Sequence, residues 1–313
     1  MEINDKLIEG GEAMLGSNVP TIGGFHTGFK WGDKWECEVI QIYITLSRKW
    51  DVPELTKEEI SKFKMAWQKS SVKEVVAHVP YLVNLTSPNK ELYRKSINRL
   101  LTEISRAIKF GVSLLVLHPG SYGKSKKEEG IKRIIEALNN VFQEIDFRGK
   151  ILLETMAGQG TSIGSRFEEL ALILEKVKKP ESLGICLDTG HLFMAGYDIR
   201  GYEGYQKVLE EFDKIIGIEK IKAIHLNDSK TGLGSRSDRH ACIGKGKLGL
   251  QVFHAILKDE RFKGIPKILE IPERDTMSEE NLKLLRKLQK RIDPLPKEKR
   301  EPTQLILSFE ERR

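Results

Sequence analysis

Cysteines are scarce in this sequence, and long hydrophobic runs and a glycine-rich dinucleotide-binding motif are missing. Each of these absences argues against a class of protein. The three cysteines among 313 residues form no C-x-x-C pair, which argues against a disulfide framework and a thiolate zinc site. No run approaches the roughly 18 apolar residues of a membrane-spanning helix. The first stretch, MEINDKLIEGGEAML, lacks the basic start and apolar core of a signal peptide. We therefore expect a protein of the reducing cytoplasm with no membrane partner.

The charge balance of the chain is basic. Lys and Arg number 52 against 45 Asp and Glu, giving a formal net charge of +7 and a pI near 9.1. This excess favours a polyanionic partner such as nucleic acid but identifies none.

Short apolar runs rich in β-branched residues recur along the chain, and longer segments of helical periodicity lie between them. Near-continuous hydrophobicity over such short lengths is typical of strands buried in a parallel sheet. The expected strands are a weaker run at 13–17 and seven clear runs at 39–45, 74–79, 113–119, 150–156, 183–189, 221–227 and 266–272. The expected helices cover residues 56–69, 90–110, 127–146, 166–178, 202–216, 249–259 and 278–291.

Eight strands alternating with helices close naturally into a (β/α)8 TIM barrel, because strand starts roughly 30–45 residues apart match one βα unit. The alternative is an open doubly wound sheet, but no G-x-G-x-x-G follows the first strand. We predict one α/β barrel domain over residues 1–290 and a charged, proline-containing tail over 291–313. In the tail, QLILSF (304–309) weakly resembles a sliding-clamp-binding peptide, although its single aromatic is out of step; packing on the barrel is the other interpretation.

Side chains that can bind a metal ion stand at the carboxyl ends of six consecutive expected strands. In a (β/α)8 barrel this end holds the active site, because the side chains there converge on the axis. Each residue alone has a structural interpretation, as a buried histidine or an ion-pair partner, but six strand ends in succession indicate one site. Histidine mixed with carboxylates is the ligand set of catalytic zinc or manganese. The residues are His78, His118, Glu154, Asp188 with His191, His225 and Glu270.

The stretch HLNDSKTGLGSRSDRH (225–240) adds two further candidate ligands. Asp238 and His240 are two residues apart, so an extended backbone points both side chains the same way. The glycines at 232 and 234 allow the loop to fold back across the barrel end. Nine candidate ligands are too many for one or two ions that keep positions open for water, so we predict three.

Six stretches of the chain, in order, resemble the endonuclease IV family of apurinic/apyrimidinic endonucleases over about residues 14–290. They are HVPYLVNL (78–85), HPGS (118–121), LETMAGQG (153–160), GICLDTGHLFMAGYD (184–198), the stretch 225–240 and ILEIP (268–272). The resemblance implies a monomeric, nucleoid-associated DNA repair enzyme with three Zn²⁺, Mn²⁺ being possible at one position. Its partner would be duplex DNA with abasic or 3′-blocked lesions. It would cleave 5′ to the abasic site, leaving a 3′-hydroxyl and a 5′-deoxyribose phosphate, and would trim 3′-blocking groups.

By the family pattern the nine candidate ligands divide among three ions. The groups are His78, His118 and Glu154; Glu154 as a bridge with Asp188, His225 and Glu270; and His191, Asp238 and His240. A hydroxide bridging the first two ions would attack the phosphate while the cations take up the developing charge. We expect Glu154, Glu270 and His118 to be catalytic as well as metal-binding.

The resemblance also implies three DNA contacts. Tyr81 and Leu82 match the residues that enter the helix at the lesion, where an aromatic and an aliphatic wedge can fill the gap left by an extruded nucleotide. Packing of their own loop is the alternative role for this pair. Arg48 matches the arginine inserted into the base stack.

The chain departs from the family pattern near these contacts. Leu46 stands where the family has Asn, and Asn18 stands where His is usual. Residues 20–36 carry more aromatics than expected, and we interpret His26, among glycines, as a loop residue. These differences concern DNA contacts and lesion preference and leave the metal ligands unchanged.

Two other function classes stay open. A sugar isomerase or epimerase on a related barrel would use one or two metals, without the third ligand group and without the Tyr81–Leu82 wedge. A protein that binds damaged or structured nucleic acid without cutting it is the other alternative, and the presence of all nine candidate ligands argues against it.

Overall fold

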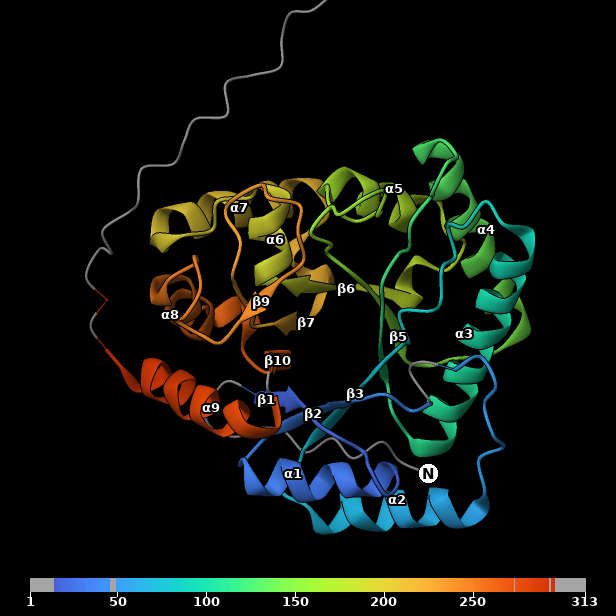
Figure 1. The fold of residues 1–313 in the computed structure, drawn as a ribbon, viewed down its shortest axis with the longest axis horizontal. Helices are drawn as coiled ribbons and strands as arrows, with labels where there is room; N and C mark the ends of the chain where they lie inside the picture. Colours follow the sequence, from blue (N-terminus) through green and yellow to red (C-terminus); the bar gives the residue numbers. More distant parts are fainter. Residues whose placement is uncertain (1–13, 46–48, 273, 293, 296–313) are drawn as a thin grey trace, which may run out of the picture.

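The structure is a computed structural model that describes residues 14–45, 49–272, 274–292 and 294–295. Eight parallel strands close into a barrel that the helices surround, so the predicted (β/α)8 fold is confirmed (Figure 1). All eight expected strands are present. Their order around the barrel is β1 (Leu15–Asn18), β10 (Lys267–Leu269), β7 (Ile221–His225), β6 (Leu183–Asp188), β5 (Lys150–Glu154), β4 (Leu114–Leu117), β3 (Glu74–His78) and β2 (Val39–Ile42).

Helices stand at all seven expected positions. Thr56 begins the first of them, as the sequence predicts, because its hydroxyl accepts from the Glu59 amide while the Glu59 carboxylate accepts from the Thr56 amide. The helices are α2 (Lys57–Lys69), α3 (Lys90–Phe110), α4 (Lys127–Glu144), α5 (Phe167–Lys176), α7 (Gly201–Ile215), α8 (Leu250–Lys258) and α9 (Arg274–Lys290).

Several elements were not predicted. The sheet of β8 and β9 joins the two ends of the 225–240 stretch as an antiparallel pair. The expectation that His26 lies in a loop is wrong, because it lies within a 3-10 helix. The additional elements are η1 (Phe25–Thr27), α1 (Gly28–Lys34), η2 (Pro180–Ser182), α6 (Thr189–Ala195), η3 (Ile218–Lys220), β8 (Asp228–Ser229), β9 (His240–Ala241) and η4 (Glu260–Phe262).

The aromatic residues of segment 20–36 serve the packing of α1. The ring of Phe29 lies 5.0 Å from that of Phe63 on α2, edge to face, and both side chains are buried. The glycines that suggested a loop have a packing role instead. A Cβ at Gly32 would approach the Val72 side chain to 2.7 Å, so glycine permits α1 to lie close against the strands.

Inside the barrel an apolar layer lies beneath a polar layer. Alternate residues of a strand point to the same side, so the residue two places after an inward apolar one points inward one layer higher. Val76 of β3 is thus followed by His78, and Leu152 of β5 by Glu154. The apolar layer consists of Met14, Val39, Val76, Val116, Leu152, Cys186, Ala223 and Ile268. The strand pattern therefore places the polar side chains together at the carboxyl end.

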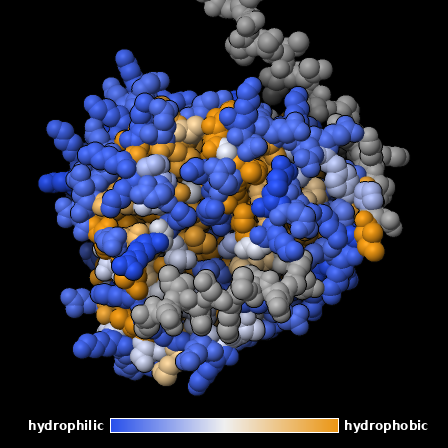
Figure 2. All heavy atoms as spheres, turned by 180° about the vertical axis from the view of Figure 1, so that it is seen from behind, coloured by the Kyte–Doolittle hydropathy of each residue, from blue (hydrophilic) through white to orange (hydrophobic). Residues whose placement is uncertain are grey.

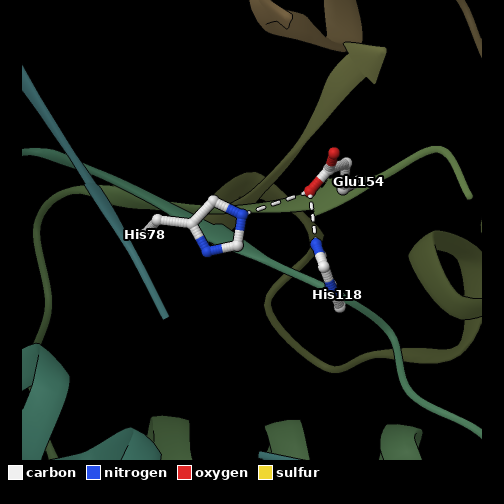
Figure 3. Close-up of side chains that lie close together, drawn as sticks. All are labelled: His78, His118 and Glu154. Atoms are coloured by element: carbon white, nitrogen blue, oxygen red, sulfur yellow. Dashed lines mark hydrogen bonds and ion pairs between the residues drawn. The ribbon is translucent and has the colours of Figure 1, made fainter. Parts of the chain in front are cut away.

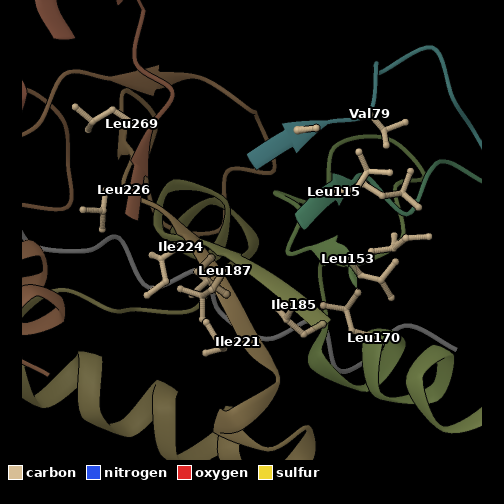
Figure 4. Close-up of a cluster of buried hydrophobic side chains, with 14 of the residues drawn as sticks. Val79, Leu115, Leu153, Leu170, Ile185, Leu187, Ile221, Ile224, Leu226 and Leu269 are labelled. Carbon is tan, nitrogen blue, oxygen red and sulfur yellow. The ribbon is translucent and has the colours of Figure 1, made fainter. Parts of the chain in front are cut away.

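A second, larger hydrophobic core lies between the strands and the helices. Leu153 of β5 and Ile185 of β6 point away from the barrel axis toward Leu170 of α5 (Figure 4). On the face opposite to the view of Figure 1, hydrophilic residues predominate and hydrophobic residues show in patches between them (Figure 2). Among the described helices none is long and apolar enough to cross a membrane.

Some sequence expectations fall outside the described residues. Arg48 and Leu46 lie in the gap at 46–48, and the QLILSF segment at 304–309 lies in the part of the tail beyond residue 295. Their predicted roles stay predictions.

Candidate metal centre

Three of the predicted ligands meet at the carboxyl ends of β3, β4 and β5. One oxygen of Glu154, Oε2, lies 3.3 Å from Nε2 of His78 and 3.0 Å from Nε2 of His118 (Figure 3). His78 donates its other ring N–H to the carbonyl of Val79 at 2.7 Å, which orients Nε2 toward Glu154. This first group is buried except for His118, whose side chain is 28 % exposed.

The second oxygen of Glu154 faces a different set of side chains. Glu154 Oε1 lies 3.1 Å from Nδ1 of His225, and Glu270 Oε2 lies 3.1 Å from the same nitrogen. Asp188 Oδ2 lies 3.7 Å from it. Glu154 thus lies between the two groups, and its Oε1 also lies 3.3 Å from Nδ1 of His191 in the third group. Its bridging of two metal ions stays a prediction.

The third group contains two imidazole nitrogens that have no hydrogen-bond partner among the described residues. His191 and His240 donate their Nδ1–H groups to the carbonyls of Thr155 and Glu270. Their Nε2 atoms are buried, make no hydrogen bond within the described residues, and each lie 3.4 Å from an oxygen of Asp238. A buried polar atom left unsatisfied costs about 1–3 kcal/mol, so these two atoms fit a bound cation.

The nine predicted ligands therefore lie in adjoining groups at one end of the barrel. Ligand atoms within 4.8 Å of one another form three sets. The third set consists of Asp188, His191 and His240, because Asp188 Oδ2 lies 3.8 Å from Nε2 of His240. Asp238, which the sequence assigns to this group, is outside the set, although its oxygens lie 3.4 Å from the two imidazoles. Imidazole and carboxylate donors without thiolate are the ligand mixture of zinc sites that keep positions open for reactants.

The electrostatics of the cluster favour cations. Burial raises the pKa of Glu154, but the charges of His118 and other neighbouring imidazoles lower it well below its ordinary value. Burial also opposes ionisation of Glu270, and His225 more than offsets it, so the pKa of Glu270 is lowered as well. The pKa of His191 is raised well above its ordinary value, because neighbouring carboxylates outweigh the effect of burial. The neighbouring imidazoles therefore favour the ionised form of Glu154 and of Glu270.

The predicted DNA wedge lies beside the first group. Tyr81 and Leu82 occupy the turn directly after β3, three and four residues past His78. Tyr81 is 58 % exposed, whereas Leu82 is half-buried. An exposed aromatic at this position is available to a partner that covers the barrel end.

Two amides that sequence reasoning missed hold the ligands from behind. Asn227 donates to Asp188 Oδ2 at 2.6 Å and accepts from the backbone amide of Glu270 at 2.9 Å. Gln41 of β2 lies between His225 and Glu270 and contacts both. Each stands two residues after an inward-facing residue of its strand, so the period of two was the signal that could have identified them.

Asp228 lies between the candidate ligands His225 and Asp238 in the sequence, but its role is structural. Its buried carboxylate accepts from four backbone amides, those of Ser229, Gly244, Gly246 and Leu248. A Cβ at Gly246 would come within 2.3 Å of Asp228 Oδ1, so this close approach requires glycine. Asp228 thus fixes the chain that returns from the Asp238–His240 ligand pair.

Comparison with known proteins identifies the family. The xylose isomerase-like TIM barrel family matches residues 29–288. A Geobacter sulfurreducens protein named "Probable endonuclease 4" is 41 % identical over 291 residues, covering 92 % of this chain and 98 % of that protein. A protein of the same name from Geotalea daltonii is 43 % identical over 279 residues, covering 88 % and 98 %.

Solved structures agree with these relatives. Endonuclease IV from Thermus thermophilus is 32 % identical, with a TM-score of 0.77 over 88 % of this chain and 98 % of that chain. A D-tagatose 3-epimerase-like protein, 18 % identical with a TM-score of 0.67 over 88 % of this chain and 98 % of that chain, shares the fold alone. This chain therefore belongs to the endonuclease IV family of xylose isomerase-like TIM barrels, as its sequence motifs indicated.

Proposed function

We propose that this protein is a zinc-dependent apurinic/apyrimidinic endonuclease of the cytoplasm that acts as a monomer on duplex DNA. It cleaves the phosphodiester bond 5′ to an abasic site, leaves a 3′-hydroxyl and a 5′-deoxyribose phosphate, and removes 3′-blocking groups. One observation carries the proposal: five histidines and four carboxylates converge at one barrel end, where two buried imidazole nitrogens have no hydrogen-bond partner among the described residues. The endonuclease 4 relatives support it.

The three groups would hold three zinc ions, with manganese possible at one of them. When bound, such ions activate water at neutral pH and take up the negative charge that develops on the phosphate and the leaving oxygen. Four carboxylates do not cancel the charge of three divalent cations, so the loaded barrel end would attract a DNA phosphate. Glu154, shared between two groups, would set their relative position, and no side-chain nucleophile is required.

The residues around the metal groups divide the remaining work. The backbone carbonyls that accept from His78, His191 and His240 fix each ring so that Nε2 faces the centre. Tyr81, exposed beside the first group, would enter the duplex and stack where the abasic nucleotide leaves a gap, with Leu82 beneath it. Recognition of the lesion and chemistry on its phosphate would then occur side by side.

The test is incision of a synthetic duplex carrying one abasic site, with the protein zinc-loaded, chelated, and reloaded. We expect cleavage at the 5′ side that the chelator abolishes and zinc restores, and parallel trimming of a 3′-blocked duplex. Absence of incision by the fully loaded protein would refute the proposal. Tight binding of the abasic duplex without incision would identify a damage-binding protein instead.

A sugar isomerase or epimerase is the competing enzyme class on this fold. The third group, with His191, Asp238 and His240, and the exposed Tyr81 favour the nuclease, because an isomerase needs neither. Metal analysis separates the two: about three zinc ions per chain support the nuclease, and one or two support the isomerase.

A further inference from the structure

Gln41 occupies a ligand position of the barrel without being a ligand. It lies on β2 two residues after Val39 of the apolar layer, so its side chain points into the polar layer, and it is fully buried. Its Oε1 lies 2.8 Å from Nε2 of His225, and its Nε2 lies 2.5 Å from Oε1 of Glu270. Both of these contacts end on predicted ligands of the second group.

The chemistry of the partners determines which atom donates in each contact. An ionised carboxylate can only accept, so the amide NH₂ of Gln41 faces Glu270 and its oxygen faces His225. That oxygen needs a donor, and the donor is the Nε2–H of His225. Nδ1 of His225 is therefore the nitrogen directed at Glu154, Asp188 and Glu270 Oε2.

We propose that Gln41 is a positioning residue that fixes the ring of His225 and the carboxylate of Glu270 in register for one metal ion. The inference rests on the metal centre proposed above. A hydrocarbon at position 41 would leave His225 Nε2–H and Glu270 Oε1 buried without partners, and a carboxylate would face Glu270 with like charge. The amide alone satisfies both groups.

The test compares the wild type with Gln41→Leu, a variant of similar volume, and with Ser17→Ala as the matched control. Ser17 is a buried polar residue of the neighbouring strand β1 whose hydroxyl contacts the Ser278 hydroxyl and the Leu269 carbonyl, and none of its hydroxyl's hydrogen bonds within the described residues is with a side chain of a predicted ligand. Zinc affinity is measured by competition with a chromophoric chelator. We expect Gln41→Leu to weaken the binding of one ion by about 10–100-fold, with Ser17→Ala within about twofold of wild type.

A second readout reports on the imidazole itself. The chain has seven histidines, so ¹⁵N-labelled histidine resolves the ring N–H signals of the zinc-loaded protein by NMR. We expect a downfield, slowly exchanging Nε2–H signal from His225 in the wild type and its loss in Gln41→Leu. Gln41→Glu keeps an acceptor for that N–H and should retain the signal, and it serves where Gln41→Leu does not fold.

Kinetics distinguish positioning from substrate contact. At saturating zinc, Gln41→Leu should lose activity in kcat with KM within about twofold, because the fully buried Gln41 contacts His225 and Glu270 and is not exposed to substrate. Either of two results would overturn this inference and leave the proposed function standing. One is a zinc affinity of Gln41→Leu equal to that of the wild type, and the other is a proton on Nδ1 of His225 in the wild-type protein. A wild type that takes up no zinc would overturn the proposed function as well.

Discussion

Lys267, buried at the amino end of β10, should make the stability of the barrel depend on pH. The side chain is 1 % exposed and donates to the carbonyls of Phe262 and Ile265, and burial lowers its pKa from 10.5 to about 8. A pKa change of this size corresponds to roughly 3 kcal/mol of unfolding free energy. Below pH 8 the folded state bears this whole cost, because Lys267 is charged in both states.

Between pH 8 and 10.5 the folded protein releases the proton while the unfolded chain retains it, so stability rises with pH across this window. Replacing Lys267 with Met removes the titration and keeps most of the side-chain volume. We expect the unfolding free energy of wild type minus that of Lys267→Met to rise by roughly 3 kcal/mol between about pH 7.5 and 10.5.

Urea unfolding of both chains with chelator present, at several pH values, gives this difference. Subtraction cancels groups common to both chains, among them the buried thiols of Cys37 and Cys186, whose pKa values burial raises to about 12. The lost bonds to the two carbonyls add an offset that does not depend on pH. A difference that stays constant within about 1 kcal/mol would refute the reasoning that burial sets the pKa of Lys267.

Three further variants test the centre and its surroundings. Glu154→Gln should reduce incision by at least about 100-fold and lower zinc content, because both groups lose their shared ligand; near-normal activity would contradict the bridging role. Tyr81→Ala should keep zinc content but reduce discrimination between abasic and intact duplex about tenfold, the size of one stacking contact; an unchanged binding ratio would assign Tyr81 to packing. Asp228→Asn should lower the free energy of unfolding by about 3 kcal/mol in urea, since backbone amides lose a charged acceptor. A loss below about 0.5 kcal/mol, less than one ordinary hydrogen bond, would show that the segment after His240 keeps its conformation without the Asp228 carboxylate.

The strands, and the meeting of the candidate ligands at one barrel end, could be predicted from the sequence. Apolar runs identified the strands, and closure into a barrel brought their carboxyl ends together, so His78 and Glu154 could be placed near each other without coordinates. The order of the strands around the barrel could also be predicted, because consecutive βα units place neighbouring strands side by side.

Other features depend on tertiary contacts that a single sequence does not display. Helix α1 was missed because the glycines around His26 favoured a loop there, whereas Gly28 and Gly32 permit the helix to pack closely against Ile40 of β2. Helix α6 was missed because Asp188 was interpreted as a ligand or a strand-end residue and not as a helix cap, although its Oδ1 accepts from the His191 amide and begins the helix. The sequence pattern indicated the possible metal-binding role of Asp188 but not its second role as the cap of α6.

The apolar layer beneath the ligands has a consequence for how ions are exchanged. Side chains such as Val76, Leu152 and Ile268 fill the barrel below the candidate ligands, so the proposed metal ions would enter and leave through the carboxyl end of the barrel. A DNA duplex bound across this end would block that route. The removal of metal by a chelator should then be slower when the protein is bound to DNA. The bound substrate would protect the metal ions that take part in its cleavage.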